Sequence, residues 1–160
     1  MGDIGEFALK HRLFLKTYPW RRIDPVPSTV LGKPLRECRV ALVSSAGLVL
    51  PGQEPFDSGI RGGDFSFREI PADTDVSKLV DTHRSETYDH AGILDDPNLA
   101  FPIDRLRELE ARGRIGSVNR RHLSFMGSIT APGRLVKHTA PEAVRTLVDD
   151  AVDAALLIPV

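Results

Sequence analysis

The sequence predicts an α/β fold built on a largely parallel sheet, and three observations carry that prediction. A nearly continuous apolar run, interrupted by Arg39, occupies residues 38–43, an amphipathic helix pattern spans residues 139–152, and a second apolar run covers residues 154–160. Nearly continuous apolar runs are typical of strands that are buried on both faces of a parallel sheet. A helix placed directly before such a strand is the usual crossover connection of that architecture.

The composition is that of an ordinary globular domain of 160 residues, with 41% hydrophobic and 27% charged side chains. A net charge of -1 argues against broad affinity for nucleic acid. The single cysteine, Cys38, excludes a disulfide framework and a cysteine-only zinc knuckle within these residues. No apolar run approaches the roughly 18 residues of a membrane helix. The acidic N-terminus does not fit a signal peptide, so we expect a cytoplasmic protein without a membrane or nucleic-acid partner.

We divide the chain into an N-terminal arm, residues 1–36, and an α/β domain, residues 37–160. The arm contains four prolines and shows no sustained periodicity. This pattern indicates a short helix near residues 9–15 followed by an extended segment. We expect such an arm to wrap the domain or a partner.

The first apolar run, Cys38–Val43, is the predicted opening strand, and the small residues Ser44–Gly47 follow it directly. Small residues at the carboxyl end of a first strand let the backbone approach a ligand closely, and open α/β sheets bind ligands at that edge. A simple tight turn explains the same residues as well, because no Gly-x-Gly-x-x-Gly pattern is present. We take Ser45 as a candidate substrate contact.

The middle of the chain alternates between loops and short elements. A loop rich in Gly and Asp spans residues 51–63 and contains Asp57, a further candidate substrate contact. Alternation over residues 65–71 predicts a short, half-exposed strand, and another strand is expected over residues 78–82. Pro102 in the first turn, an apolar stripe at helical spacing and Gly113 after the last turn predict a helix between them.

The C-terminal pattern is the best marked. Thr139 and Glu142 form a Thr-x-x-Glu capping box, which predicts a helix start at that point. The apolar run 154–160 then predicts a second strand buried within a parallel sheet. A buried strand normally leads into a loop and into further helices that cover the sheet. The arrangement is therefore Rossmann- or flavodoxin-like, with three layers, and incomplete at its C-terminus.

Three side chains that can bind a metal or transfer a proton follow the spacing His-x-x-Glu-x-x-x-His. They are His83, Glu86 and His90. On a helix they would share one face. Two imidazoles with a carboxylate suit zinc or ferrous iron, with His122 or Asp89 completing the set. The segment is also turn-prone, which leaves a loop open. In a loop the same residues would hold an organic substrate, move protons during bond cleavage, or form a polar surface without a ligand.

Charged side chains elsewhere are further candidates. Arg68 and Glu69 are interpreted as a structural ion pair in preference to substrate contacts, because charges on a half-exposed strand usually pair across strands. The basic run Arg120–His122 fits either an anionic ligand or, in preference, a solvated surface. The full set of candidate substrate-binding residues is Ser45, Asp57, Arg68, Glu69, His83, Glu86 and His122.

Several ordered motifs give the chain a more specific resemblance. The runs FSFREIP at residues 65–71, HRSETYDH at 83–90 and NLAFPIDRLREL at 98–109 are followed by GRIGS at 113–117 and HLSFMG at 122–127. In this order they resemble the selenoprotein B family of glycine, sarcosine, betaine and D-proline reductases. The resemblance covers about residues 39–160.

The resemblance implies a reductase that cleaves a carbon–nitrogen or other carbon–heteroatom bond in a small amino-acid-like substrate. Family members continue after the matching strand with a selenocysteine or cysteine spaced by two residues from another cysteine. The redox nucleophile would therefore follow Val160 directly or closely. A thiolate or selenolate is the reactive group of such motifs, so no catalytic residue is assigned within the chain. A selenocysteine codon read as a stop and a deliberate truncation would both place the chain end at Val160.

The resemblance also implies partners. Family members work with a pyruvoyl-bearing chain and a selenoprotein carrier, so we expect a thiol or selenol redox partner. Independently of the resemblance, we expect a homo-oligomer that forms through the C-terminal strand. No cofactor is assigned apart from the zinc or iron considered above. The alternative function is a non-catalytic metal- or ligand-binding module that self-associates through its C-terminal strand, because an unpaired sheet edge is a template for association.

Overall fold

The structure of the protein is a computed structural model that describes residues 8–19, 22–86 and 88–160. The chain divides into two compact units, residues 1–30 and residues 31–160. The described part of the first unit contains the helix α1 (Leu9–Thr17), which confirms the helix predicted near residues 9–15. No described helix is long and apolar enough to cross a membrane.

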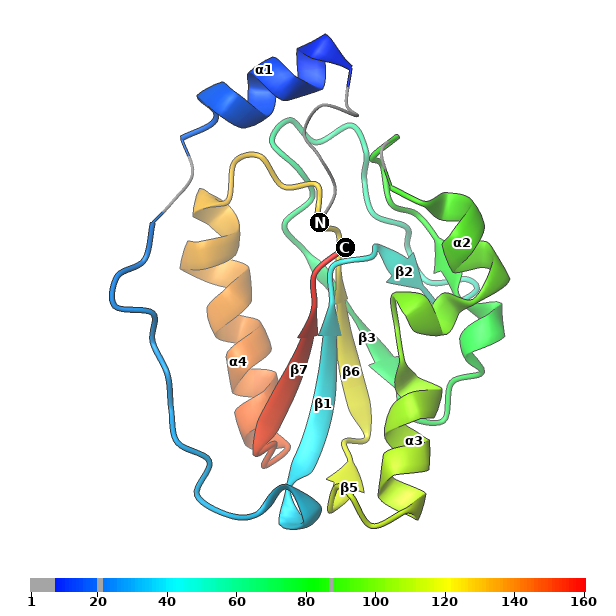
Figure 1. Ribbon diagram of the computed structural model, residues 1–160. Helices are drawn as coiled ribbons and strands as arrows, with labels where there is room; N and C mark the ends of the chain where they lie inside the picture. The colour runs from blue at the N-terminus through cyan, green and yellow to red at the C-terminus, as the bar shows by residue number, and fades with distance from the viewer. Residues whose placement is uncertain (1–7, 20–21, 87) are drawn as a thin grey trace. The chain divides into compact units, whose positions relative to one another are not determined.

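The second unit contains the sheet and the remaining helices (Figure 1). In chain order its elements are η2 (Leu35–Glu37), β1 (Arg39–Ser44), β2 (Leu48–Val49), β3 (Phe67–Pro71), η3 (Val76–Lys78), β4 (Val80–Asp81), α2 (His90–Asp95), η4 (Pro97–Leu99), α3 (Ile103–Ala111), β5 (Ser117–Val118), β6 (Arg121–Phe125), η5 (Leu135–Thr139), α4 (Ala140–Asp149) and β7 (Ala154–Ile158).

The sheet is mostly parallel, with β1 at its centre. β1 pairs in parallel with β5 near its start, with β6 near its end and with β7 along its length. β3 joins the other side of β6 as an antiparallel strand, and β2 and β4 form a separate antiparallel pair. This topology confirms the predicted α/β fold with a largely parallel sheet.

The two faces of β1 pack against different helices, because successive side chains of a strand point to opposite sides. Leu42 belongs to the main apolar core together with Ile103 and Leu106 of α3. Val43, the next residue, lies in a pocket with Leu135 of η5 and with Ala140, the first residue of α4. α3 and the η5–α4 segment therefore cover opposite faces of the sheet.

The second apolar run forms the predicted strand, but not a buried one. β7 pairs with β1 alone among the described strands. Its Leu156 and Leu157 side chains are 42% and 66% exposed. The prediction of a strand buried on both faces is therefore wrong for β7. A strand that lies at the edge of a sheet has neighbours on one side only, and its apolar side chains stay partly uncovered.

The last helix begins differently from the prediction. Thr139 has helical backbone angles, φ -74° and ψ -41°, and its side chain makes no cap hydrogen bond. A capping residue needs non-helical angles, so the predicted capping box of Thr139 and Glu142 is wrong. The preceding turn η5 is π-helical, and the Ala140 N–H donates to the Leu135 carbonyl. Pro141 lacks an N–H and crowds the carbonyl four residues back, which favours this wider turn.

Candidate functional site

The strongest candidate site is a pocket of about 630 Å³ at the carboxyl ends of β1, β6 and β7. Figure 1 shows these strands ending at one edge of the sheet, where the C-terminus also lies. The lining comes from residues 43–45, 125–127, 129, 132, 135, 140 and 157–160. This edge is where open α/β sheets bind ligands, and the sequence predicts a site at this place.

The pocket lining is apolar and carries no charged side chain. Its side-chain hydroxyls belong to Ser44 and Ser45, at the end of β1. The Ser44 hydroxyl is buried and donates to the Ala100 carbonyl at 2.7 Å. Of the seven candidate substrate-binding residues, the pocket therefore contains Ser45 and none of the others. Water held in such a pocket finds few polar partners, which favours an apolar or partly apolar occupant.

The end of β1 lies against the segment that carries His83. Gly47 has a φ of +68°, and a Cβ at this position would lie 3.1 Å from the His83 Cα. The Thr82 N–H donates to the Gly47 carbonyl at 3.1 Å. Glycine is needed here both for its backbone angle and for the close approach. The small residues after the first strand therefore let the backbone approach a neighbouring segment of the chain, and the predicted close approach to a ligand stays a prediction.

His83 is the centre of a small aromatic cluster. Its ring stacks on Tyr88 at 4.3 Å between centroids, and Tyr88 packs edge-on against His90 at 4.8 Å. The His83 Nδ1 accepts from the Ser85 N–H at 3.3 Å, while its buried Nε2 has no partner among the described residues. Burial lowers the pKa of His83. The Asp81 carboxylate accepts a hydrogen bond from the His90 Nδ1 at 2.5 Å, which raises the pKa of His90.

The helical face proposed for the metal hypothesis does not form. Residues 83–86 and 88–89 contain no helix, and α2 starts at His90. Glu86 is exposed, whereas His83 is buried. Within the described parts of the chain, no group of three or more His, Cys, Asp and Glu side chains converges in a way that could hold a metal ion.

Arg68 and Glu69 do not pair with each other. The Arg68 guanidinium donates to the carbonyls of Glu54 and Pro55 and lies over the Phe56 ring at 4.5 Å. It therefore fixes the Gly- and Asp-rich loop to β3. Glu69 instead pairs with Arg121 of the neighbouring strand β6 at 3.1 Å. Asp57 lies within the same loop, where its carboxylate accepts from the Gly59 N–H at 2.7 Å.

His122 lies in the protein core, with no exposed surface. Its Nδ1 accepts a hydrogen bond from the Leu42 N–H at 2.9 Å, so the proton of the neutral ring sits on Nε2, which has no partner. Phe101 packs edge-on against the ring. Burial lowers the pKa of His122 to about 4. These contacts tie β6 to β1 and place His122 outside the pocket.

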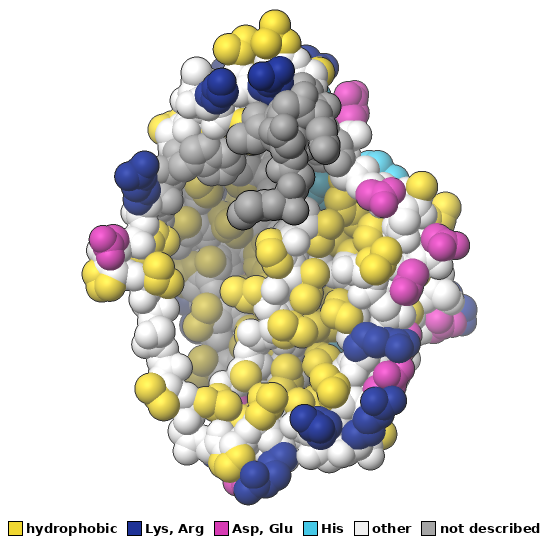
Figure 2. Space-filling view, viewed as in Figure 1, with side chains coloured by type: hydrophobic (Ala, Val, Ile, Leu, Met, Phe, Trp, Pro, Cys, Tyr) yellow, Lys and Arg dark blue, Asp and Glu magenta, His cyan; other side chains and the backbone are white. Residues whose placement is uncertain are grey.

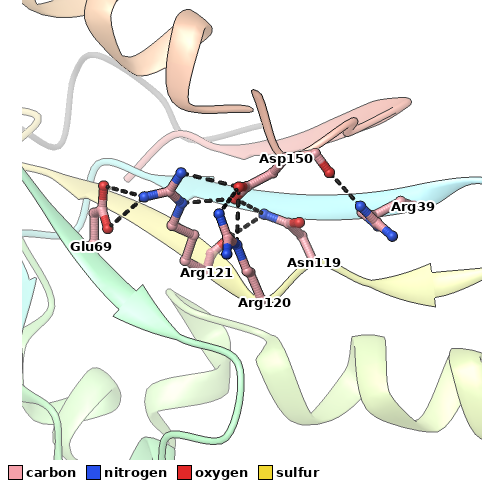
Figure 3. A network of polar contacts seen from close by, with 6 residues as sticks. All are labelled: Arg39, Glu69, Asn119, Arg120, Arg121 and Asp150. Atoms are coloured by element: carbon pink, nitrogen blue, oxygen red, sulfur yellow. Dashed lines mark hydrogen bonds and ion pairs between the residues drawn. The ribbon is translucent and has the colours of Figure 1, made fainter. Parts of the chain in front are cut away.

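A polar network that the sequence did not reveal lies at the opposite edge of the sheet (Figure 3). Asp150 follows the last residue of α4, and its side chain is 1% exposed. Its partners are Asn119, Arg120 and Arg121 through the carboxylate, and Arg39 through the carbonyl. The guanidinium groups hold the pKa of the Asp150 carboxyl well below its ordinary range. The network fixes the C-terminal end of α4 to the amino edge of the sheet.

That network also corrects the interpretation of the basic run Arg120–His122. Arg120 and Arg121 both bind the buried Asp150 carboxylate, although the Arg120 side chain is 74% exposed to solvent as the preferred interpretation expects. The sequence did contain one indication of this network, which is the acidic residue Asp150 at the end of a strongly amphipathic helix. Nothing in the local pattern identified its partners, which lie some 30 residues earlier in the chain.

Comparison with known proteins adds the family. The model of the family described as Glycine/sarcosine/betaine reductase selenoprotein B (GRDB) matches residues 7–159. The D-proline reductase subunit gamma of Acetoanaerobium sticklandii is 36% identical over 136 residues, which is 84% of this chain and 54% of the relative. No solved structure matches the chain.

Two further relatives come from Peptoclostridium acidaminophilum. The sarcosine reductase complex component B subunit beta is 31% identical and covers 90% of this chain, and the glycine reductase complex component B subunit gamma is 27% identical and covers 93%. The chain spans about a third of the length of these two and about half of the D-proline reductase subunit. With nearly the whole chain matched by one family model, the chain belongs to the glycine/sarcosine/betaine reductase selenoprotein B family.

Proposed function

We propose that the chain forms the pocket-bearing part of a reductase subunit that cleaves a carbon–nitrogen or other carbon–heteroatom bond in a small amino-acid-like substrate. The observation that carries the proposal is the pocket at the carboxyl edge of the sheet, whose rim includes Pro159 and Val160. Relatives named for their action on D-proline, sarcosine and glycine support this chemistry.

In this proposal the redox nucleophile is a cysteine or selenocysteine that follows Val160 at the pocket rim. A thiolate or selenolate is the reactive form of such a group. An apolar lining keeps water away from the reacting atoms and strengthens every electrostatic interaction inside the pocket. Electrons would come from a thiol or selenol partner protein.

The uncharged lining also constrains how the substrate is held. An amino-acid-like substrate carries a carboxylate, and burying that charge without a partner is costly. Since no side chain of the described lining is charged, the pocket holds the apolar part of the substrate. The carboxylate would be bound by groups outside the lining, including those of partner chains.

The test begins with the nucleotide sequence after the codon for Val160 and the intact mass of the protein from its native host. A UGA or cysteine codon that opens a continuing frame with a second cysteine would support the proposal. The full-length protein, supplied with a dithiol reductant and its partner subunits, is then expected to cleave the Cα–N bond reductively. This cleavage opens the ring of D-proline to a linear amino acid that keeps its amine, and it releases the free amine from sarcosine, betaine or glycine. A true stop codon with a matching native mass would overturn the redox role.

One observation favours a second candidate function, which is self-association through β7. The outer edge of β7 has no strand partner among the described residues. Leu157 on this strand is 66% exposed. Figure 2 shows apolar side chains gathered over β7 and β1. An unpaired edge with exposed apolar side chains is a template for strand addition from another chain.

A further inference from the structure

The ends of β1 and β7 are joined by a side chain. Regular pairing between the two strands runs from Val40 with Ala154 to Ser44 with Ile158. Beyond it, the Ser45 N–H donates to the Ile158 carbonyl at 3.0 Å. The next bond departs from the ladder, because the Val160 N–H donates to the Ser45 hydroxyl oxygen at 2.9 Å.

The reason for this departure lies on the other side of β1. The Ser45 carbonyl, which a regular ladder would offer to Val160, instead accepts from the Gly127 N–H at 2.7 Å. The Ser45 hydroxyl takes its place, and its own proton faces the carbonyls of Ile158 and Val160 at 3.5 and 3.4 Å. One serine therefore connects the ends of all three strands that border the pocket.

Gly127 completes this arrangement through the absence of a side chain. A Cβ at this position would lie 2.9 Å from the Ser45 Oγ and 3.0 Å from the Ser45 carbonyl oxygen. Any larger residue would push the hydroxyl away from Val160. The sequence therefore needs both a hydroxyl at position 45 and a glycine at position 127.

We propose that Ser45 is a positioning residue whose hydroxyl fixes the backbone of Val160, and with it the direction in which the chain leaves β7 at the pocket rim. This inference rests on the proposed function in so far as the redox nucleophile follows Val160. It assigns Ser45 a role different from the substrate contact expected from the sequence. A hydroxyl bonded to the backbone on both sides sets the geometry of the neighbouring residue instead of binding a ligand.

The first experiment measures amide hydrogen exchange at Val160 by NMR in the 160-residue protein and its variants. Ser45→Ala is expected to speed exchange of the Val160 amide by roughly tenfold, the effect of losing one hydrogen bond of about 1.4 kcal/mol. Ser45→Thr keeps the hydroxyl and is expected to restore protection. Gly127→Ala should mimic Ser45→Ala by displacing the hydroxyl.

Ser44→Ala is the matched control. It removes the neighbouring hydroxyl, which donates to the Ala100 carbonyl and accepts from the Ala46 N–H, away from Val160. Ser44→Ala should lower global stability and leave exchange at Val160 unchanged. The inference is overturned by equal Val160 exchange in Ser45→Ala and the unaltered protein, or by equal acceleration in Ser44→Ala.

The second experiment uses the full-length protein, read through the codon after Val160. Misplacing a reacting group by about 1 Å lowers turnover by as much as a hundredfold. Ser45→Ala is therefore expected to reduce kcat at least tenfold while KM stays within twofold, and Ser45→Thr should recover kcat. An inactive unaltered protein would count against the proposed function, whereas an active one with equal kcat in Ser45→Ala would count against the inference.

Discussion

At the scale of single residues, His122 was a candidate substrate contact, but it is a buried core residue that stabilises the fold. Its Nδ1 accepts from Leu42, so protonation of that nitrogen would break a buried hydrogen bond. Burial lowers its pKa from 6.5 to about 4. The unfolded chain therefore binds this proton more readily, and the stability that His122 contributes is complete above pH 6.5 and is lost as pH falls toward 4. The difference amounts to about 3 kcal/mol.

We predict that His122→Asn flattens this pH dependence. Asparagine keeps an acceptor for the Leu42 N–H and does not titrate. Between pH 6.5 and 4 the free energy of unfolding of the variant should therefore fall by about 3 kcal/mol less than that of the unaltered protein. Urea titrations at a series of pH values measure this slope. His138→Asn, the same substitution at an exposed histidine, is the control and is measured in the same way. An unchanged slope in His122→Asn would contradict the assignment.

Asp150 carries the second prediction at the residue scale. Its carboxylate is buried and bound by Arg120 and Arg121, which depress its pKa below the ordinary value of 3.8. Asp150→Asn should cost about 2 kcal/mol at pH 7, the value of a hydrogen bond to a charged group. The difference should narrow as pH falls below 3.8, where the unfolded chain takes up the proton that the folded protein excludes. The neighbouring, exposed Asp149→Asn should change stability by less than about 0.5 kcal/mol in the same titration.

At the scale of elements, the hydrophobic pattern predicted those helices and strands whose apolar residues follow a regular spacing. β1, β3, α3 and β7 form close to their predicted places, since each has a continuous or alternating apolar signal. β6 was missed, because its buried positions include His122 and Ser124, polar residues whose burial depends on partners far away in the chain. The π-helical turn before α4 was missed because Thr139 and Glu142 match a capping box, and the pattern does not register the constraint from Pro141.

The same limits apply to the site. The sequence predicts its location at the carboxyl end of the first strand, because topology alone determines that edge. It does not predict the lining, since Ile129, Pro132 and Leu135 come from a segment without a marked pattern. The candidate residues were mostly charged side chains and histidines, which lie outside the pocket because its walls are apolar.

The third prediction concerns the buried face of α3. Leu106 is 3% exposed and belongs to the main core, whereas Leu109 on the same helix is 38% exposed. Leu106→Ala should lower the free energy of unfolding by about 2–4 kcal/mol through lost burial and the cavity left behind. Leu109→Ala should cost less than about 1 kcal/mol. Chemical denaturation with a common m value measures both, and equal losses would show that the helix packs differently.

At the scale of the whole molecule, one property of the sheet links both candidate functions. Among the described strands β7 pairs with β1 alone, so its unpaired edge and part of the pocket lining are formed by the same few residues. A chain that pairs with this edge would lie beside the pocket and shield it from water. Assembly and closure of the pocket would then be coupled, which fits a family whose curated relatives are named as subunits of reductases or reductase complexes.

The last prediction tests that edge. If a second chain adds to β7, the melting temperature should rise with protein concentration, because association stabilises the folded state by mass action. Leu157→Lys places a charge on the exposed edge, which blocks strand addition. The variant should sediment as a monomer, with a melting temperature that no longer depends on concentration. Leu94→Lys, on a side chain that is 83% exposed in α2, should leave association unchanged. A monomeric unaltered protein that melts at one temperature across the concentration range would contradict pairing between two copies. In that case assembly and closure of the pocket could be coupled only if a different chain paired with the edge of β7.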